Sequence, residues 1–147
     1  MRRRLKPLGL ASVAVFIACQ FVTVDRSNPR VDPAKDLYAT ATVPRDVRSI
    51  LRRSCDDCHS NETHWPWYSY VAPFSWLVAF DVREGREDLS FSIWRTYSAE
   101  TKEQKLKAIC RRVRQGEMPD GKYTLIHRAA RLTDADRQAL CRWTEGE

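Results

Sequence analysis

Residues Ser54–Ser69 read SCDDCHSNETHWPWYS, and the interpretation of the chain starts from this stretch. Two cysteines, Cys55 and Cys58, are separated by two residues, and His59 follows directly. A cluster of aromatic residues around a proline comes next. Thiols and imidazoles bind metals and cofactors, so this spacing indicates a binding site.

The spacing of the two cysteines and the histidine fits a covalently bound haem. The segment CDDCH matches the C-x-x-C-H pattern at which c-type haem is attached. Two thiols at this spacing can reach the two vinyl groups of one porphyrin, and the adjacent histidine can turn under the ring to bind iron. We therefore expect one haem c held by Cys55, Cys58 and His59. The other ring nitrogen of the histidine would donate to a backbone carbonyl, for which Pro66 and Pro73 are the candidates.

Three other interpretations of the cysteine pair are open. A thioredoxin-like redox pair would begin a helix after a strand, whereas this pair follows a helical pattern. A zinc site would need two further ligands, for example His64 and Cys110, without the usual second closely spaced pair. A structural disulfide between Cys55 and Cys58 is the simplest alternative. The haem motif is favoured over these three, because the match is rare by chance and covalent haem attachment takes place outside the cytoplasm.

Most of the chain resembles a known family. Residues from about Asn28 to Trp143 resemble the haem-binding domain family of small, membrane-anchored bacterial c-type cytochromes. The resemblance rests on the segments SNPRVDP, CDDCHSNETHWPWYS, APFSWLV, DVREGR, GEMP and LTDADRQALCRW. It implies a largely helical domain with a single haem, and it supplies neither a redox partner nor a catalytic activity.

The N-terminus has the composition of a targeting segment. The basic sequence MRRRLKP is followed by an uncharged run, Leu8–Val24, at the short end of what spans a membrane. We expect an uncleaved signal anchor over residues 1–24, with a cleaved signal peptide and a lipoprotein modified at Cys19 as alternatives. The basic flank would stay in the cytoplasm, which places the rest at the periplasmic face of a bacterial inner membrane.

The remainder divides into a linker and one domain. Residues 25–40 are polar and contain two prolines, which predicts an extended linker. Residues 41–147 are expected to form the haem domain, which is long enough for a modest core. The basic residues ahead of Asp25 account for most of the net charge of +6, so the domain itself is nearly neutral. A nucleic-acid partner is therefore not expected.

Hydrophobic periodicity predicts an all-α, small cytochrome-c-like domain with about four helices and long loops. The first helix would begin at Pro44 and present the cysteines where it ends. No stretch alternates as a strand does. The other helices are expected over residues 73–85, 98–116 and 132–146, with caps at Ser98 and Thr133 and stops at Gly85 and Gly116.

The iron would need a second axial ligand on the face opposite His59. Met118 lies in a loop after the third predicted helix and precedes a proline, which disfavours helical backbone there. Met118 is therefore the expected ligand, with His127 or an open site as alternatives. His64 is a further alternative, although a residue so close to His59 in the sequence would struggle to reach the opposite face.

The aromatic residues after the motif are expected to cover the haem. Tryptophan and tyrosine bury large apolar areas, while their N–H and O–H groups can face the polar propionate edge. The cofactor-binding residues predicted on this basis are Trp65, Trp67, Tyr68 and Trp76, with Phe74 beside them.

Cys110 and Cys141 lie beside the apolar faces of the two last predicted helices. In an oxidising compartment they are expected to form a disulfide between these helices, and two buried free thiols are the alternative.

These observations favour a membrane-tethered cytochrome that carries one electron between extracytoplasmic redox proteins. His59 and Met118 would saturate the iron, so the site would exchange electrons and bind no substrate. One alternative is a haem-based sensor or small-ligand binder in which Met118 is displaceable. Another is a peroxidase-like enzyme with an open distal face, where His127 and Arg128 could act.

Overall fold

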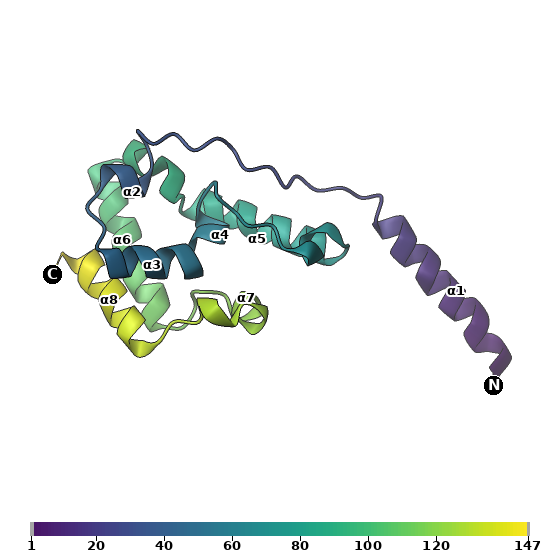
Figure 1. The fold of residues 1–147 in the computed structure, drawn as a ribbon. Coiled ribbons are helices and arrows are strands. Elements are labelled where there is room, and N and C mark those ends of the chain that lie inside the picture. The colour runs from purple at the N-terminus through teal and green to yellow at the C-terminus, as the bar shows by residue number, and fades with distance from the viewer. Residues whose placement is uncertain (1, 147) are drawn as a thin grey trace.

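Three helices of the computed structural model, which describes residues 2–146, form the core of the domain. They are α3 (Arg45–Ser54), α6 (Ala99–Arg114) and α8 (Asp134–Glu145), and α8 packs against both of the others. Figure 1 shows α8 and α6 side by side at one end of the molecule, with α3 close to them. Leu51 and Leu140 are fully buried between them, and such burial stabilises the fold by about 1.5–3 kcal/mol per side chain.

The helix ends follow the capping residues in the sequence. The Ser98 side chain accepts a hydrogen bond from the backbone N–H of Thr101, and Thr133 and Asp136 form a reciprocal capping box. Gly116, just beyond α6, has φ of +71°, a left-handed conformation that favours glycine. The predicted limits of the third and fourth helices are therefore confirmed to within a few residues.

One predicted helix end is wrong. The helix α5 runs over Phe74–Asp88, so it continues past Gly85 instead of stopping there. Gly85 is a packing position, because a Cβ atom there would lie 2.6 Å from the carbonyl oxygen of Cys58. The glycine lets α5 approach the cysteine segment closely.

Several short elements complete the fold, and no strand occurs within residues 2–146. The all-α prediction is confirmed, although the helices outnumber the four expected. The helices besides those above are α1 (Arg2–Cys19), α2 (Leu37–Thr40), α4 (Asp56–His59) and α7 (Gly121–Ile126). The 3-10 helices are η1 (Trp67–Tyr70), η2 (Phe91–Thr96) and η3 (Arg128–Ala130).

The segment predicted as a linker runs along the domain and contacts it. Arg86, on α5, donates hydrogen bonds to the Ser27 carbonyl (3.2 Å) and to the Asn28 side chain (2.9 Å). The same guanidinium donates to Ser60 and Thr63 in the loop after α4. Farther along, α2 buries Leu37 completely. Arg86 thus joins three segments, although the predicted boundary between linker and domain stays a prediction.

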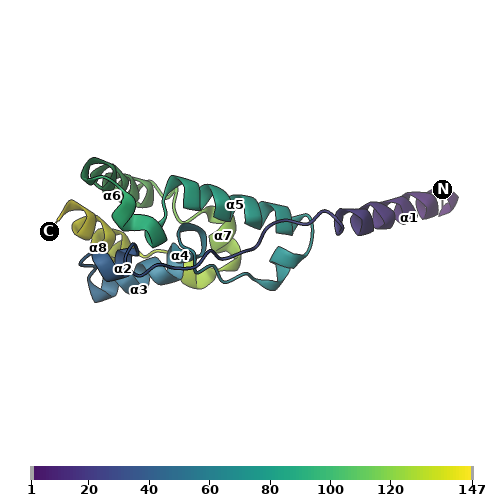
Figure 2. The same ribbon diagram turned by 90° about the horizontal axis from the view of Figure 1, so that it is seen from above.

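The helix α1 points away from the domain, beyond the end where η1 and the start of α5 lie (Figures 1 and 2). No helix found among residues 2–146 combines the length and the apolar character needed to cross a membrane.

A disulfide joins Cys110 of α6 to Cys141 of α8, as predicted. Both side chains are buried in the helix interface. The cross-link fixes the two longest helices of the core to each other.

Candidate haem site

The two cysteines of the motif lie where α3 ends and α4 begins. The backbone N–H of Cys55 still bonds to the Leu51 carbonyl (2.8 Å), so Cys55 closes α3. Its own carbonyl accepts from the N–H groups of Cys58 and His59, which form the single turn of α4. The helical turn puts both thiols and the imidazole on one short, rigid segment. The prediction that the first helix delivers the cysteines is confirmed.

His59 is oriented by the last turns of α5. Its Nδ1 atom lies 2.9 Å from the carbonyl oxygens of both Gly85 and Leu89. Since carbonyls only accept, Nδ1 carries the proton and Nε2 keeps its lone pair. Burial lowers the pKa of His59, although the two hydrogen bonds oppose this. The geometry holds a neutral imidazole whose Nε2 is ready to bind a metal.

The predicted acceptors of the Nδ1–H group of His59 were wrong. Pro66 and Pro73 were the candidates, whereas the acceptors belong to Gly85 and Leu89. The reason is the close approach of α5 at Gly85, which brings its carboxyl-terminal carbonyls to the imidazole. Phe91 also packs near the ring, with the ring centroids 6.1 Å apart.

Both thiols of the motif are free in the structure, so the alternative Cys55–Cys58 disulfide is not formed. Burial, followed by the charge of Asp56, raises the pKa of Cys55 to about 12. Burial also raises the pKa of Cys58 to about 12, helped by the carboxylate of Asp57. The two side chains are therefore neutral thiols at neutral pH.

Met118 lies in the loop after α6, as its position before a proline suggested. Its backbone N–H bonds to the Arg112 carbonyl (3.3 Å), and its half-buried side chain packs against the hydrophobic core. Arg112 pairs with Asp88 at the end of α5 (3.7 Å), and its charge also acts on His59. This chain of contacts links the Met118 loop to the helix that orients the histidine. The role of Met118 as iron ligand stays a prediction.

Among the four predicted haem-covering aromatics, Trp67 and Tyr68 contact each other edge to face, with 5.9 Å between ring centroids. Trp65 donates from Nε1 to the Asn28 side chain, and Trp76 donates from Nε1 to the Val22 carbonyl. Trp67 is 78% exposed. Tyr68 instead faces His127, with 2.5 Å between its hydroxyl and Nε2. That these side chains cover a haem stays a prediction.

Sequence reasoning missed a polar and aromatic group beside the cysteines. The Tyr123 ring stacks on His127 at 4.3 Å between centroids, and its hydroxyl donates to Asp57 (2.7 Å). Burial raises the pKa of Tyr123, and the hydrogen bond to Asp57 adds to this. Tyr68 completes the group through His127. The only signal in the sequence was the nearness of Tyr123 to Met118 and His127, because the short α7 shows no periodicity.

His64, another candidate ligand, points into solvent. Its side chain is 93% exposed and lies beside Asp57. It lies on the surface rather than across the site from His59.

Comparison with known proteins shows the family of the chain. The family described as haem-binding domain matches residues 14–146. The chain belongs to this haem-binding domain family. It is therefore a haem protein, as the motif indicated.

A curated relative is cytochrome c peroxidase Ccp of Escherichia coli (strain K12). The two sequences are 26% identical over an alignment of 149 residues. The match covers 97% of this chain and 32% of that protein. The haem-binding domain thus spans about a third of the length of this relative. No solved structure matches the chain.

The residues of this haem-binding domain fit the covalent attachment of a haem. Two free thiols stand at the required spacing, and the adjacent imidazole presents Nε2. Around them, Asp81 of α5 and Asp120 before α7 lie close enough to Cys58 to affect its pKa. A haem held here would therefore lie close to α4, α5 and the start of α7.

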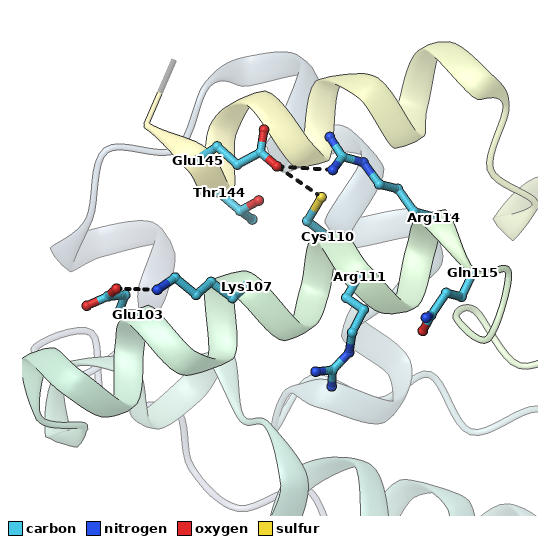
Figure 3. A pocket seen from close by; sticks show the side chains of 8 residues that line it. All are labelled: Glu103, Lys107, Cys110, Arg111, Arg114, Gln115, Thr144 and Glu145. Atoms are coloured by element: carbon cyan, nitrogen blue, oxygen red, sulfur yellow. Dashed lines mark hydrogen bonds and ion pairs between the residues drawn. The ribbon is translucent and has the colours of Figure 1, made fainter.

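A hollow in the described part of the chain lies away from the haem motif. It measures about 590 Å³ and lies between α6 and α8, and Figure 3 shows Glu145 pointing toward Arg114 there (3.2 Å). Its lining includes the disulfide residue Cys110 but none of the haem-motif residues. No group of three or more His, Cys, Asp or Glu side chains within residues 2–146 is arranged to hold a metal ion.

Proposed function

We propose that the chain is a c-type cytochrome with one covalent haem, which carries single electrons between partner proteins. The thioethers would form at Cys55 and Cys58, and Nε2 of His59 would bind the iron. The observation that carries the proposal is the hydrogen bonding of His59. Its Nδ1–H is held by two carbonyls of α5, which fixes both the tautomer and the ring orientation that ligation requires.

The protein's contribution to electron transfer would be a rigid and mostly dry site. Bound haem supplies reversible one-electron exchange at its iron. His59 is held from α5, and the segment that carries the two thiols is fixed between α3 and α5. Met118, supplied from the loop after α6, is the proposed distal ligand, and a thioether raises the reduction potential relative to a second histidine.

The proposed setting is the periplasmic face of a bacterial inner membrane. The basic N-terminus and the uncharged run that follows support a membrane tether. A tether would keep the haem near membrane-bound redox partners and raise its effective concentration there.

A peroxidase-like activity is a second candidate, because the curated relative is named cytochrome c peroxidase. Such an activity would need an open distal face with a base. His127 is engaged by Tyr68 and stacked on Tyr123, so it is held in place rather than free to move. The favoured proposal therefore remains electron transfer, with Met118 on the iron.

Carbon monoxide binding to the reduced protein separates these functions. The protein should be matured in a host with c-type haem attachment machinery, and compared with Met118→Ala and His127→Ala. We expect slow binding in the wild type and in His127→Ala, and fast binding in Met118→Ala. Fast binding in the wild type, together with rapid turnover of hydrogen peroxide, would contradict electron transfer and favour the peroxidase. A spectrum changed only by His127→Ala would assign the distal ligand to His127.

A further inference from the structure

We propose that one end of the domain, which we call the aromatic tip, rests on the surface of a lipid bilayer. The aromatic tip consists of Trp67 and Tyr70 in η1 and Phe74 at the start of α5. This inference rests on the membrane tether of the proposed function and adds a second point of contact with the membrane. It would orient the haem site as well as tether it.

Each of the three rings of the aromatic tip is more than half exposed. Trp67 is 78% exposed, Tyr70 59% and Phe74 54%. Single exposed rings are common on soluble proteins, but three at one end of a small domain are a candidate contact surface. Their position next to α1 indicates what covers them.

Hydrogen bonds fix the segment just after α1 beside the aromatic tip. The side-chain amide of Gln20 accepts from the Ala72 N–H (3.0 Å) and donates to the Ala72 carbonyl (3.3 Å). Two residues on, the Val22 carbonyl accepts from Nε1 of Trp76 (3.1 Å). The chain therefore leaves the domain from a fixed point within a few residues of all three rings.

From Leu8 onward, α1 carries no charged residue and almost all of its side chains are exposed. Its exposed side chains include Leu10 (74%), Val15 (62%) and Ile17 (53%), and Phe21 just beyond it is 81% exposed. Exposed apolar side chains such as these are more stable in an apolar environment than in water. In Figures 1 and 2 α1 extends outward from the domain end that carries η1, so no part of the domain covers it. With α1 in lipid, the aromatic tip would lie at the surface of the bilayer.

The chemistry of the aromatic tip suits the interface between lipid tails and headgroups. Tryptophan and tyrosine are enriched at this depth, because each has an apolar ring and a polar group. The guanidinium of Arg26 lies over the Tyr70 ring, 4.6 Å from its centroid. An arginine beside this ring can bind lipid phosphates. A partner surface made only of apolar residues would leave its charge unpaired.

This contact would set the height of the haem site above the membrane. Gly85, whose carbonyl holds His59, lies three turns of α5 beyond Phe74. At 1.5 Å per residue this corresponds to roughly 16 Å along the helix. The iron ligand would then lie within reach of the exposed parts of membrane-bound partners instead of being free to swing at the end of a linker.

Photo-cross-linking to lipid tests the inference on the full, haem-loaded chain. Vesicles of phosphatidylcholine and phosphatidylglycerol would carry a small fraction of phospholipid with a diazirine near the headgroup. After illumination, mass spectrometry would locate the lipid adducts. We expect adducts on α1 and on peptides covering residues 67–76, at least about tenfold more often than on residues 99–114 of α6. Tyr70→Ser/Phe74→Ser should lose most adducts at residues 67–76, whereas the control Ile93→Ser, on η2, should keep them.

The other outcomes overturn the inference in distinguishable ways. Adducts on α1 without adducts on the aromatic tip would leave the tether intact and remove the second contact. Protein that stays in the aqueous fraction without adducts would contradict the tether, and its haem spectrum would still report on the haem proposal independently. A dimer of the full chain in sedimentation that Tyr70→Ser/Phe74→Ser dissociates, with no lipid adducts, would show that a second copy covers this surface.

Discussion

The Nδ1 atom of His59 and the carbonyl oxygen of Gly85 lie 2.9 Å apart, which joins the cysteine motif to α5. The contact depends on a missing side chain, because any Cβ at Gly85 would meet the carbonyl of Cys58 at 2.6 Å. The same glycine therefore sets both the packing of α5 on α4 and the orientation of the proposed iron ligand.

Gly85→Ala is expected to destabilise the protein and to disturb the histidine. The new methyl group would push α5 away from the backbone of Cys58, at a cost of about 1–3 kcal/mol. The measurement is the free energy of unfolding in urea, together with the optical spectrum of the haem-loaded protein. Gly121→Ala is the matched control, because a Cβ atom there meets nothing within 4 Å and should change stability by less than about 1 kcal/mol. Equal effects of the two substitutions would contradict the proposed packing role.

Asp56 is expected to make the fold more stable at mildly acidic pH. Burial raises the pKa of Asp56 to about 6 from 3.8, although the Tyr38 hydroxyl donates to it (2.6 Å). The folded state thus takes up this proton more readily than the unfolded state. Its contribution to the free energy of unfolding rises as the pH falls from about 6 to about 4, by on the order of 3 kcal/mol at most.

The check is a comparison of urea unfolding at several pH values. Asp56→Asn cannot ionise, so the wild type should gain stability relative to this variant as the pH falls through this window. Glu117→Gln, which alters an exposed carboxylate in the loop before Met118, serves as the control. A constant difference between wild type and Asp56→Asn from pH 4 to pH 7 would refute the assigned shift.

The disulfide between Cys110 and Cys141 is expected to stabilise the domain without taking part in haem binding. It closes a loop with a sequence separation of 31 residues, for which the loop-entropy estimate is about 3–4 kcal/mol. Reduction by dithiothreitol should lower the unfolding temperature by an amount that Cys110→Ala/Cys141→Ala reproduces. Thioethers resist this reductant, so the haem should stay attached. Loss of haem on reduction would contradict the assignment of cysteines.

Arg86 is expected to hold the segment before α2 against the domain. Arg86→Ala would remove its hydrogen bonds to Ser27, Asn28, Ser60 and Thr63, with a loss on the order of 2 kcal/mol. Limited proteolysis should then cut within residues 25–36 much faster than in the wild type. Arg83→Ala is the control, since Arg83 is 63% exposed and its contacts are the surface ion pairs with Glu84 and Glu87 and the ring of Phe80. Such surface pairs contribute about 1 kcal/mol or less.

The sequence predicted the parts of the fold that follow from local patterns. Apolar spacing and capping residues located α6 and α8, since Ser98 and Thr133 cap them in the structure. The short helices α4 and α7, of four and six residues, were not predicted, because so few residues do not show periodicity. Gly85 was predicted to end its helix, because a local pattern does not show what packs against a glycine.

The candidate site was predictable only where its chemistry is contiguous in the chain. Cys55, Cys58 and His59 stand together, so their spacing carries the prediction. The acceptors of the His59 proton lie 26 and 30 residues away and depend on how α5 packs. The contact between Tyr123 and Asp57 spans 66 residues and likewise needs the fold. Such long-range contacts have no signature in a single sequence.

The most direct test of the central claim is a haem-stained denaturing gel of protein matured with c-type haem attachment machinery. The account predicts a stained band for the wild type that disappears in Cys55→Ala/Cys58→Ala and persists in the matched pair Cys110→Ala/Cys141→Ala. A wild-type band without stain, or a stain that survives the loss of Cys55 and Cys58, would contradict covalent attachment at this motif.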